Sequence, residues 1–210
     1  MSTKKSIKTK FIVIVLATEI LVVTAFIGAI FFIFYNNIRE SSLQIVNNTA
    51  GFYNSLVDGD TKMLSAALDT FITNETFQQL FAKGDINAVQ KASEDLFLHN
   101  RKQYGVTHFY YIDNNGICQL RMHQPELRGD KITRTTFEAA KKGNRLASGI
   151  ELGKTAYALR VVSPYMDKNS QIGFVEFGEE IEHFNGIVKR ETGIDIALLS
   201  DKKLLNEEAY

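Results

Sequence analysis

The stretch LRMHQPELRGDKI, residues 120–132, gathers the side chains of this sequence that are best suited to chemistry. It contains Arg121, His123 and Arg128 and then a Gly-Asp turn. Arginine offers a planar fork of N–H donors that fits a carboxylate, and histidine can take up a proton or bind a metal ion. Three roles are therefore open to this stretch: a metal site, a catalytic site, or the edge of a pocket for a small anion.

Metal binding and catalysis lack the motifs that they need. Zinc or iron sites use histidines or cysteines at short, defined spacings, and the sequence has no HxxxH, HExxH, HxH or CxxC pattern. It also has no GxSxG or GxGxxG motif, and SGIELGKT lacks the glycine spacing of a phosphate-binding loop. The single cysteine, Cys118, excludes an internal disulfide. We therefore expect no metal, no cofactor and no enzymatic activity.

The pocket interpretation depends on which side chains share a face of a strand. Side chains alternate along a strand, so Arg121 and Cys118 are expected on opposite faces, and His123 on the face of Arg121. Pro125 cannot donate to a sheet ladder and ends the strand. Arg160 falls on a later predicted strand. In that strand Tyr157 is expected on the other face.

An alternative role for the same arginines stays open. Arg121 and Arg160 can instead pair with Glu151 and Glu176, two acids on otherwise apolar predicted strands, across a solvated sheet face. His123 can likewise be a structural hydrogen-bonding residue. The residues alone do not separate a binding pocket from an internal salt-bridge face.

The elements that must position these residues form an α+β pattern. A short helix, a KGD turn and a second helix are predicted over residues 73–105, with Asn74 or Thr76 and Asp85 as N-caps. An Asn-Gly hairpin follows in VTHFYYIDNNGICQLRM, and then a helix begins near Thr135 or Thr136. Three more strands are expected at about 146–152, 155–163 and 171–179. A short helix, EHFNGIVKRETG, and a last strand, IDIALLS, complete the pattern.

The N-terminal region predicts a membrane anchor. MSTKKSIKTK carries four lysines, and the apolar segment that follows, residues 11–35, is long enough to span about 30 Å of hydrocarbon. No small-residue cleavage site follows it. Because the lysines precede the span, the positive-inside rule places the N-terminus in the cytoplasm and residues 36–210 outside. Glu19 within the span is either a functional group or a tolerated carboxyl near one interface.

A long helix is expected after the membrane. Small or apolar residues recur with alternating steps of three and four, with the polar Asp60 in one slot, which is a heptad-like seam weakened near Gly59. The seam either packs on its own domain or continues a homodimer interface from the membrane, and both can hold on different stretches. Its members are Leu43, Val46, Ala50, Tyr53, Val57, Leu64, Ala67 and Phe71.

The predicted order of elements, a membrane anchor followed by a long helix and an antiparallel sheet, resembles that of bacterial extracytoplasmic Cache domains. These are the PAS-like, double-Cache-type sensors of chemoreceptors and sensor histidine kinases. The resemblance covers about residues 36–210. It is carried by three segments: FYYIDNNGICQLRMHQPELRGDKI, ASGIELGKTAYALRVVSPYMDKNSQIGFVEFGEEI and TGIDIALLSDKKLL. It implies a five-or-more-stranded antiparallel PAS-like sheet with a ligand pocket bounded by the sheet, its flanking helix and the incoming loops. The candidate ligand-binding residues are then Arg121, His123, Arg128, Tyr157 and Arg160.

These observations together predict a single-pass sensor of a bacterial inner (cell) membrane, with its C-terminal domain periplasmic or extracellular. The expected partners are a small organic anion or amino acid, the membrane and a second copy through the membrane-proximal helix. Nucleic acid is not expected, since the formal net charge is zero and basic residues are dispersed. A membrane-anchored structural or interaction protein without a ligand is the alternative, and the chain is either a fragment of a longer receptor or a stand-alone sensor. The expected regions are a cytoplasmic tail at 1–10, the anchor at 11–35, a membrane-proximal helical region at 36–104, the sensor sheet at 105–200 and a tail at 201–210.

Overall fold

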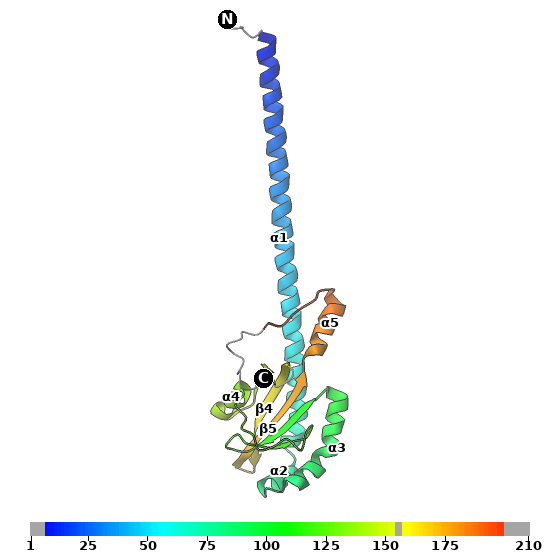
Figure 1. The fold of residues 1–210 in the computed structure, drawn as a ribbon, viewed down its shortest axis with the longest axis vertical. Helices are drawn as coiled ribbons and strands as arrows, with labels where there is room; N and C mark the ends of the chain where they lie inside the picture. The colour runs from blue at the N-terminus through cyan, green and yellow to red at the C-terminus, as the bar shows by residue number, and fades with distance from the viewer. Residues whose placement is uncertain (1–6, 154–156, 200–210) are drawn as a thin grey trace. The chain divides into compact units, whose positions relative to one another are not determined.

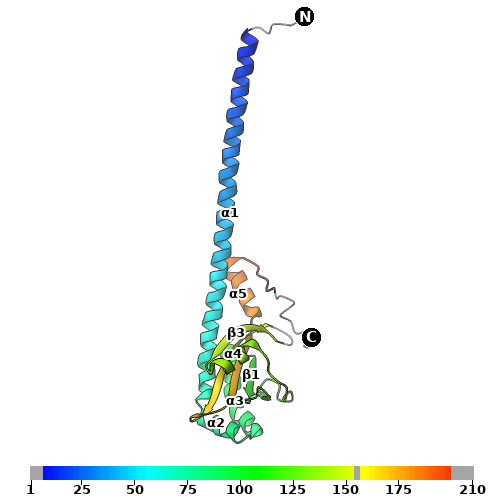
Figure 2. The ribbon, with the colours of Figure 1, turned by 90° about the vertical axis from the view of Figure 1, so that its left-hand side faces the viewer.

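The computed structural model describes residues 7–153 and 157–199, and its ribbon is drawn in Figures 1 and 2. The predicted tail at 201–210, most of the tail at 1–10 and the predicted strand start at 155 therefore lie outside the described residues. The chain divides into two compact units between Gly51 and Phe52.

The first element, α1 (Ile7–Ile72), is one continuous helix of 66 residues. Its N-terminal part is the one segment among the described residues that is long and apolar enough to cross a membrane. The helix continues through Gly59 without a break, because one glycine costs only about 1 kcal/mol and the neighbouring turns pack Leu56, Val57 and Leu64 on the core.

Two shorter helices follow, as predicted, and their N-caps are confirmed. Asn74 precedes α2 (Glu75–Ala82) and accepts a hydrogen bond from the N–H of Phe77 at 3.2 Å. Asp85 precedes α3 (Ile86–Tyr104) and accepts one from the N–H of Ala88 at 3.1 Å. These side chains satisfy backbone donors that have no partner within the helix. The left-handed Gly105 ends α3.

The sheet has five antiparallel strands in the order β2-β1-β5-β4-β3. The predicted hairpin forms β1 (His108–Ile112) and β2 (Cys118–Arg121), and the helix predicted after it is α4 (Thr135–Gly143). The chain continues into β3 (Ala147–Leu152), β4 (Tyr157–Asp167), β5 (Ser170–Glu180) and α5 (Glu182–Thr192). The predicted α+β class with five or more strands is confirmed.

Helices cover both faces of this sheet (Figure 1). On one face, the C-terminal part of α1 buries Leu64 and Phe71 among strand residues such as Phe109 and Phe177. Helices α2 and α3 complete that core. On the other face, α4 buries Phe137 against Phe174. For the C-terminal half of the α1 seam, the prediction that it packs on its own domain is confirmed.

Two details of the strand predictions are corrected. Strand β4 extends beyond 163 to Asp167 although it contains Pro164. Strand β3 pairs with β4 only as far as Val162, so the proline lies where one edge of β4 is open and a missing N–H is tolerated. The strand predicted in IDIALLS is wrong for residues 194–199, which have no regular structure. Leu198 and Leu199 are exposed, so the apolar alternation there has no surface to bury.

Candidate functional site

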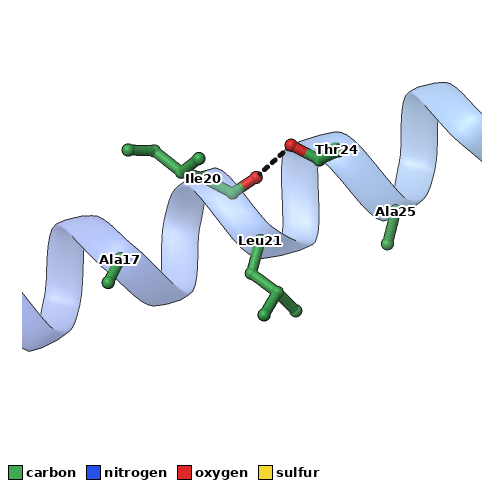
Figure 3. Close-up of a pocket in the computed structure, with 5 residues that line it drawn as sticks. All are labelled: Ala17, Ile20, Leu21, Thr24 and Ala25. Atoms are coloured by element: carbon green, nitrogen blue, oxygen red, sulfur yellow. Dashed lines mark hydrogen bonds between the residues drawn. The ribbon is translucent and has the colours of Figure 1, made fainter.

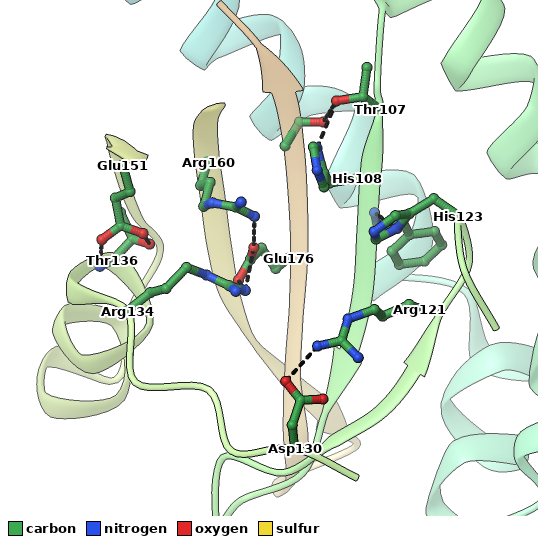
Figure 4. Close-up of polar contacts among 12 residues, drawn as sticks. Thr107, His108, Arg121, His123, Asp130, Arg134, Thr136, Glu151, Arg160 and Glu176 are labelled. Carbon is green, nitrogen blue, oxygen red and sulfur yellow. Dashed lines mark hydrogen bonds and ion pairs between the residues drawn. The ribbon is translucent and has the colours of Figure 1, made fainter. Parts of the chain in front are cut away.

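The α4 face of the sheet carries a cluster of buried and half-buried polar side chains from β1, β2, β4, β5 and the loop before α4 (Figure 4). Its centre is the buried ring of Tyr110 on β1. The guanidinium carbons of Arg121, Arg134 and Arg160 lie 5.3, 4.8 and 5.9 Å from the centroid of that ring. Three cations on one aromatic ring form an electropositive centre, which we call the arginine cluster.

Glu176 on β5 neutralises part of this charge. Its carboxylate accepts two hydrogen bonds from Arg134 Nη2, at 2.7 and 2.6 Å, and one from Arg160 Nη1 at 2.6 Å. The glutamate is fully buried and Arg160 is 2% exposed. Burial alone would raise the pKa of Glu176, but the two arginines outweigh it and the pKa is lowered. Glu176 is therefore ionised at neutral pH.

Arg121 is held from the other side by the loop that follows β2. Its Nη2 lies 2.5 Å from Asp130 Oδ2, and its Nη1 donates to the carbonyl of Leu127. Pairing of β2 with β1 places Arg121 opposite Tyr110. The loop between β2 and α4 folds back over the sheet and brings Arg134 to the same ring.

Two histidines border the cluster and remain neutral. Burial, together with the positive charge of neighbouring arginines, lowers the pKa of His108 to about 3 and that of His123 to about 4. The N–H of Phe109 donates to His123 Nδ1 at 3.2 Å. In the neutral ring the proton therefore lies on Nε2, which is a donor. A neutral donor next to three arginines adds to the preference of this face for an acceptor.

A small hollow of about 270 Å³ adjoins the cluster between the start of α4 and β3, which lie side by side. Glu151 closes one side, where its carboxylate accepts from the N–H of Thr136 at 2.8 Å and from its hydroxyl at 2.7 Å. This volume lies just below the range of about 300–1,000 Å³ that is usual for ligand sites. Its lining consists of Thr135, Thr136, Ala139, Ser148, Gly149, Ile150 and Glu151.

A second hollow lies on the apolar part of α1 (Figure 3) and has a different character. It is lined by a single helix face with small side chains, including Ala17 and Ala25. The Thr24 hydroxyl donates to the carbonyl of Ile20 at 2.8 Å, so it offers no free donor to a ligand. This surface has no charged group and no second element to enclose a small molecule.

The structure brings together some of the sequence-predicted residues but not others. Arg121, His123 and Arg160 lie on the α4 face. Arg128 is exposed in the loop, and Tyr157 packs against the core on the opposite face. The predicted ion pair between Arg160 and Glu176 is present.

The other predicted pair is not present, and three members of the cluster were missed. Arg121 binds Asp130 instead of Glu151. Arg134, Tyr110 and His108 were absent from the prediction. Strand alternation places Tyr110 and His108 on one face, whereas Arg134 precedes a helix and has no periodic signal.

Comparison with known proteins agrees with this fold. Residues 39–210 match the dCache_3 family, described as the double sensory domain of two-component sensor kinase. No curated protein sequence matches the chain. The structure is similar to the E. coli DcuS sensor domain, with a TM-score of 0.53 and 23% identity, over 63% of this chain and 97% of that chain. At this identity the similarity concerns the fold alone.

Two longer Vibrio domains are also similar. The domain of a sensory box/GGDEF family protein from Vibrio parahaemolyticus has a TM-score of 0.49 and 15% identity over 71% of this chain and 63% of that one. The V. cholerae histidine kinase DctB sensor domain has a TM-score of 0.48 and 11% identity over 66% of this chain and 61% of that one. The match thus covers less than two thirds of either Vibrio domain. The family match over residues 39–210 confirms the resemblance seen in the sequence, and the chain belongs to the Cache sensor domains of the dCache_3 family.

Proposed function

We propose that this chain is the extracytoplasmic sensing part of a membrane receptor and that its arginine cluster binds a small organic anion, such as a carboxylate or an amino acid. In this proposal the chain has no catalytic activity. Its output is a change in the packing of α1, used in chemotaxis or two-component signalling. Membership of a sensory family supports the class of function.

The observation that carries the choice of ligand is a pair of unused donors. Arg134 Nε and Arg160 Nε are both buried and have no hydrogen-bond partner among the described residues. A buried donor without an acceptor costs about 1–3 kcal/mol, and more when the group is charged. A bound carboxylate would supply acceptors to these N–H groups and to the His123 N–H, so binding would relieve this penalty.

Three acids lie near the three arginines. Arg121, Arg134 and Arg160 surround Tyr110, while Glu176 and the half-exposed Asp130 are the carboxylates bonded to them. Glu151, beside the adjoining hollow, is a third acid, and its charge also acts on Arg134. The unused donors, and not a net charge, therefore carry the choice of an anion. If these ion pairs serve structure alone, the protein is an anchored interaction protein without a ligand. Binding experiments separate these possibilities.

Membrane anchoring and orientation follow from α1. Its apolar segment would span the bacterial inner membrane once, and the lysines before it would stay in the cytoplasm. Leu43 and Val46, beyond the apolar segment, are exposed apolar residues of the predicted seam. We infer that they meet a second copy of the chain. A ligand can shift the packing of such helices only if it binds the two arrangements with unequal affinity.

A thermal-shift screen tests the proposed function. The purified chain in detergent would be heated with a panel of carboxylates, amino acids, amines and nucleobases. A ligand at about 100 times its Kd adds roughly 2.7 kcal/mol to folding stability, which is a clear shift in Tm. Hits restricted to anions or zwitterions support the proposal. A well-folded protein that gives no hit, or hits only among amines, contradicts it.

A further inference from the structure

Three potential metal ligands converge on the face of the sheet opposite the arginine cluster. Asp60 comes from α1, Glu179 from β5 and His183 from α5. Each offers one ligand atom, and these atoms all lie within 4.8 Å of one another. The three residues belong to the same compact unit, Phe52–Tyr210.

The orientation of the His183 ring places one hydrogen-bond acceptor, its Nε2, against another, the Asp60 carboxylate. Its Nδ1 lies 2.9 Å from the backbone carbonyl of Glu180, and a carbonyl oxygen only accepts, so Nδ1 carries the ring proton. In the neutral ring Nε2 then presents a lone pair. That atom lies 3.2 Å from Asp60 Oδ2, which is also an acceptor. The pair needs a positive species, either a proton or a metal ion.

Glu179 adds an unsatisfied, buried oxygen to the same place. The residue is 3% exposed, and no group in the described part of the chain donates a hydrogen bond to its Oε1. Burial, the negative charge of Asp60 and a hydrogen bond shared with Asp60 raise the pKa of Glu179 to about 8, so without a metal ion the two carboxyls share a proton. No Lys or Arg within residues 7–153 and 157–199 forms an ion pair with it. A metal ion bound here would take the place of that proton and would lie next to a buried oxygen that has no hydrogen-bond partner among the described residues.

We propose that Asp60, Glu179 and His183 bind a divalent metal ion, with zinc as the best match to their donor set. Zinc accepts carboxylate oxygen and imidazole nitrogen at about 2.0–2.2 Å, and three protein ligands plus water are a common arrangement. Ligand atoms on one tetrahedral zinc ion lie roughly 3.3 Å apart, close to the 3.2 Å between Asp60 and His183.

The surroundings of His183 fit such a site. The hydrogen bond from Nδ1 to a backbone carbonyl fixes the ring and its tautomer, as is usual for metal-bound histidines. The His183 side chain is 43% exposed, which gives an ion a way in from solvent. The sequence predicted no metal because the three ligands come from distant segments and have no motif spacing.

Metal binding at this point would fasten α1 to the sheet. Asp60 lies on the helix that also contains the apolar segment, whereas Glu179 and His183 lie on β5 and α5. An ion bound by all three stabilises the arrangement of α1 seen here relative to any other. The cation site would therefore set how readily α1 moves.

Zinc binding by the tag-free full chain in detergent tests the proposal. The protein would be stripped with a chelator and titrated with ZnCl2 against a chromogenic chelator, and Tm would be recorded with and without zinc. We expect one zinc ion per chain and a rise in Tm of roughly 5 °C or more at saturation. Asp60→Asn, Glu179→Gln and His183→Ala should each weaken zinc binding at least tenfold.

Matched controls distinguish this site from adventitious binding. Asp58→Asn changes an exposed aspartate two residues away, and His99→Ala removes another exposed histidine. His123→Ala removes one ring of the close pair formed by His108 and His123. All three should bind zinc as the unmodified chain does. The proposal is overturned if the chain binds no zinc, if His123→Ala abolishes binding, or if His183→Ala and Glu179→Gln, when folded, bind zinc normally.

Discussion

Glu176 and Glu179 lie on the same strand, β5, but their buried carboxyls point to opposite faces of the sheet and meet opposite electrostatic surroundings. Glu176 receives hydrogen bonds from two arginines, and its pKa is lowered. Glu179 has a carboxylate neighbour, Asp60, and its pKa is raised to about 8. One strand thus connects a cationic site that would attract an anion to an anionic site that would attract a cation.

Replacement of Glu176 by Gln should destabilise the fold strongly. It removes the negative charge shared by two buried guanidinium groups, and breaking a buried ion pair from one side costs about 3–5 kcal/mol. Glu180→Gln, an exposed neighbour on the same strand, should change stability by no more than about 0.5 kcal/mol. Urea unfolding of both variants measures the difference. Equal stability of the two would show that the arginines do not need Glu176.

Stability should fall as the pH is lowered, partly through His123. Its folded pKa is about 4, below the unfolded value of about 6.5, so the unfolded state binds more protons between these values. The stability that this histidine contributes is present above pH 6.5 and is lost as the pH falls toward 4. The charged or titratable groups around it are Arg121, Arg160, Glu176 and His108.

The contribution of His123 is isolated by comparison with His123→Gln, which keeps an acceptor for the N–H of Phe109. The loss of stability between pH 7 and pH 5 should be smaller in the variant, as measured by urea unfolding at both values. Contributions from distant titrating groups, including Glu179, largely cancel in this difference, whereas that of His108, which contacts His123, does not. An identical loss in both proteins would mean that His123 is not buried and neutral.

The helices, the hairpin and much of the cluster could be predicted because their signals are local. Asn74 and Asp85 are good N-caps, and strand alternation places Arg160 on the α4 face. Strand alternation also assigned Tyr157 to the face opposite Arg160. Naming Tyr157 as a ligand-binding residue therefore conflicted with the strand pattern. Residues 194–199 alternate like a strand but find no strand partner.

The place of Arg134 in the arginine cluster could not be predicted from the local sequence pattern. It reaches Glu176, 42 residues later in the chain, only because the loop after β2 folds back over the sheet. The course of that loop depends on long-range contacts such as the Ile117–Lys131 bridge. Asp60, Glu179 and His183 are likewise brought together only by long-range contacts, so the local sequence could not predict their cluster.

Two arginines from the stretch 120–132 should differ in their effect on ligand affinity. Arg121 lies beside Tyr110, whereas Arg128 is exposed. Arg121→Gln should weaken binding of the strongest anion from the screen about tenfold or more, since a charged hydrogen bond contributes about 1.5–3 kcal/mol. Arg128→Gln should leave affinity unchanged. Titration calorimetry compares them, and the reverse order would place the ligand in the outer loop.

Two copies of the chain should meet along the exposed part of the α1 seam. Leu43→Cys and Val46→Cys should form cross-linked dimers under mild oxidation, because both residues lie on the predicted interface. Asn48→Cys, about 200° around the helix from Val46, is the matched control and should cross-link much more slowly. Buried Cys118 should not interfere. Equal cross-linking at all three positions, read on non-reducing gels, would argue against a defined seam.

Calorimetric titration of the unmodified chain and of Arg134→Gln with the same anion, at fixed ionic strength, tests the central claim most directly. Arg134 carries an unused buried Nε–H, while Glu176 keeps Arg160 as its partner when Arg134 is replaced. We predict one binding site per chain and an affinity at least tenfold weaker in the variant, with the fold retained. Undiminished affinity in a folded Arg134→Gln protein would contradict binding of the anion at the arginine cluster.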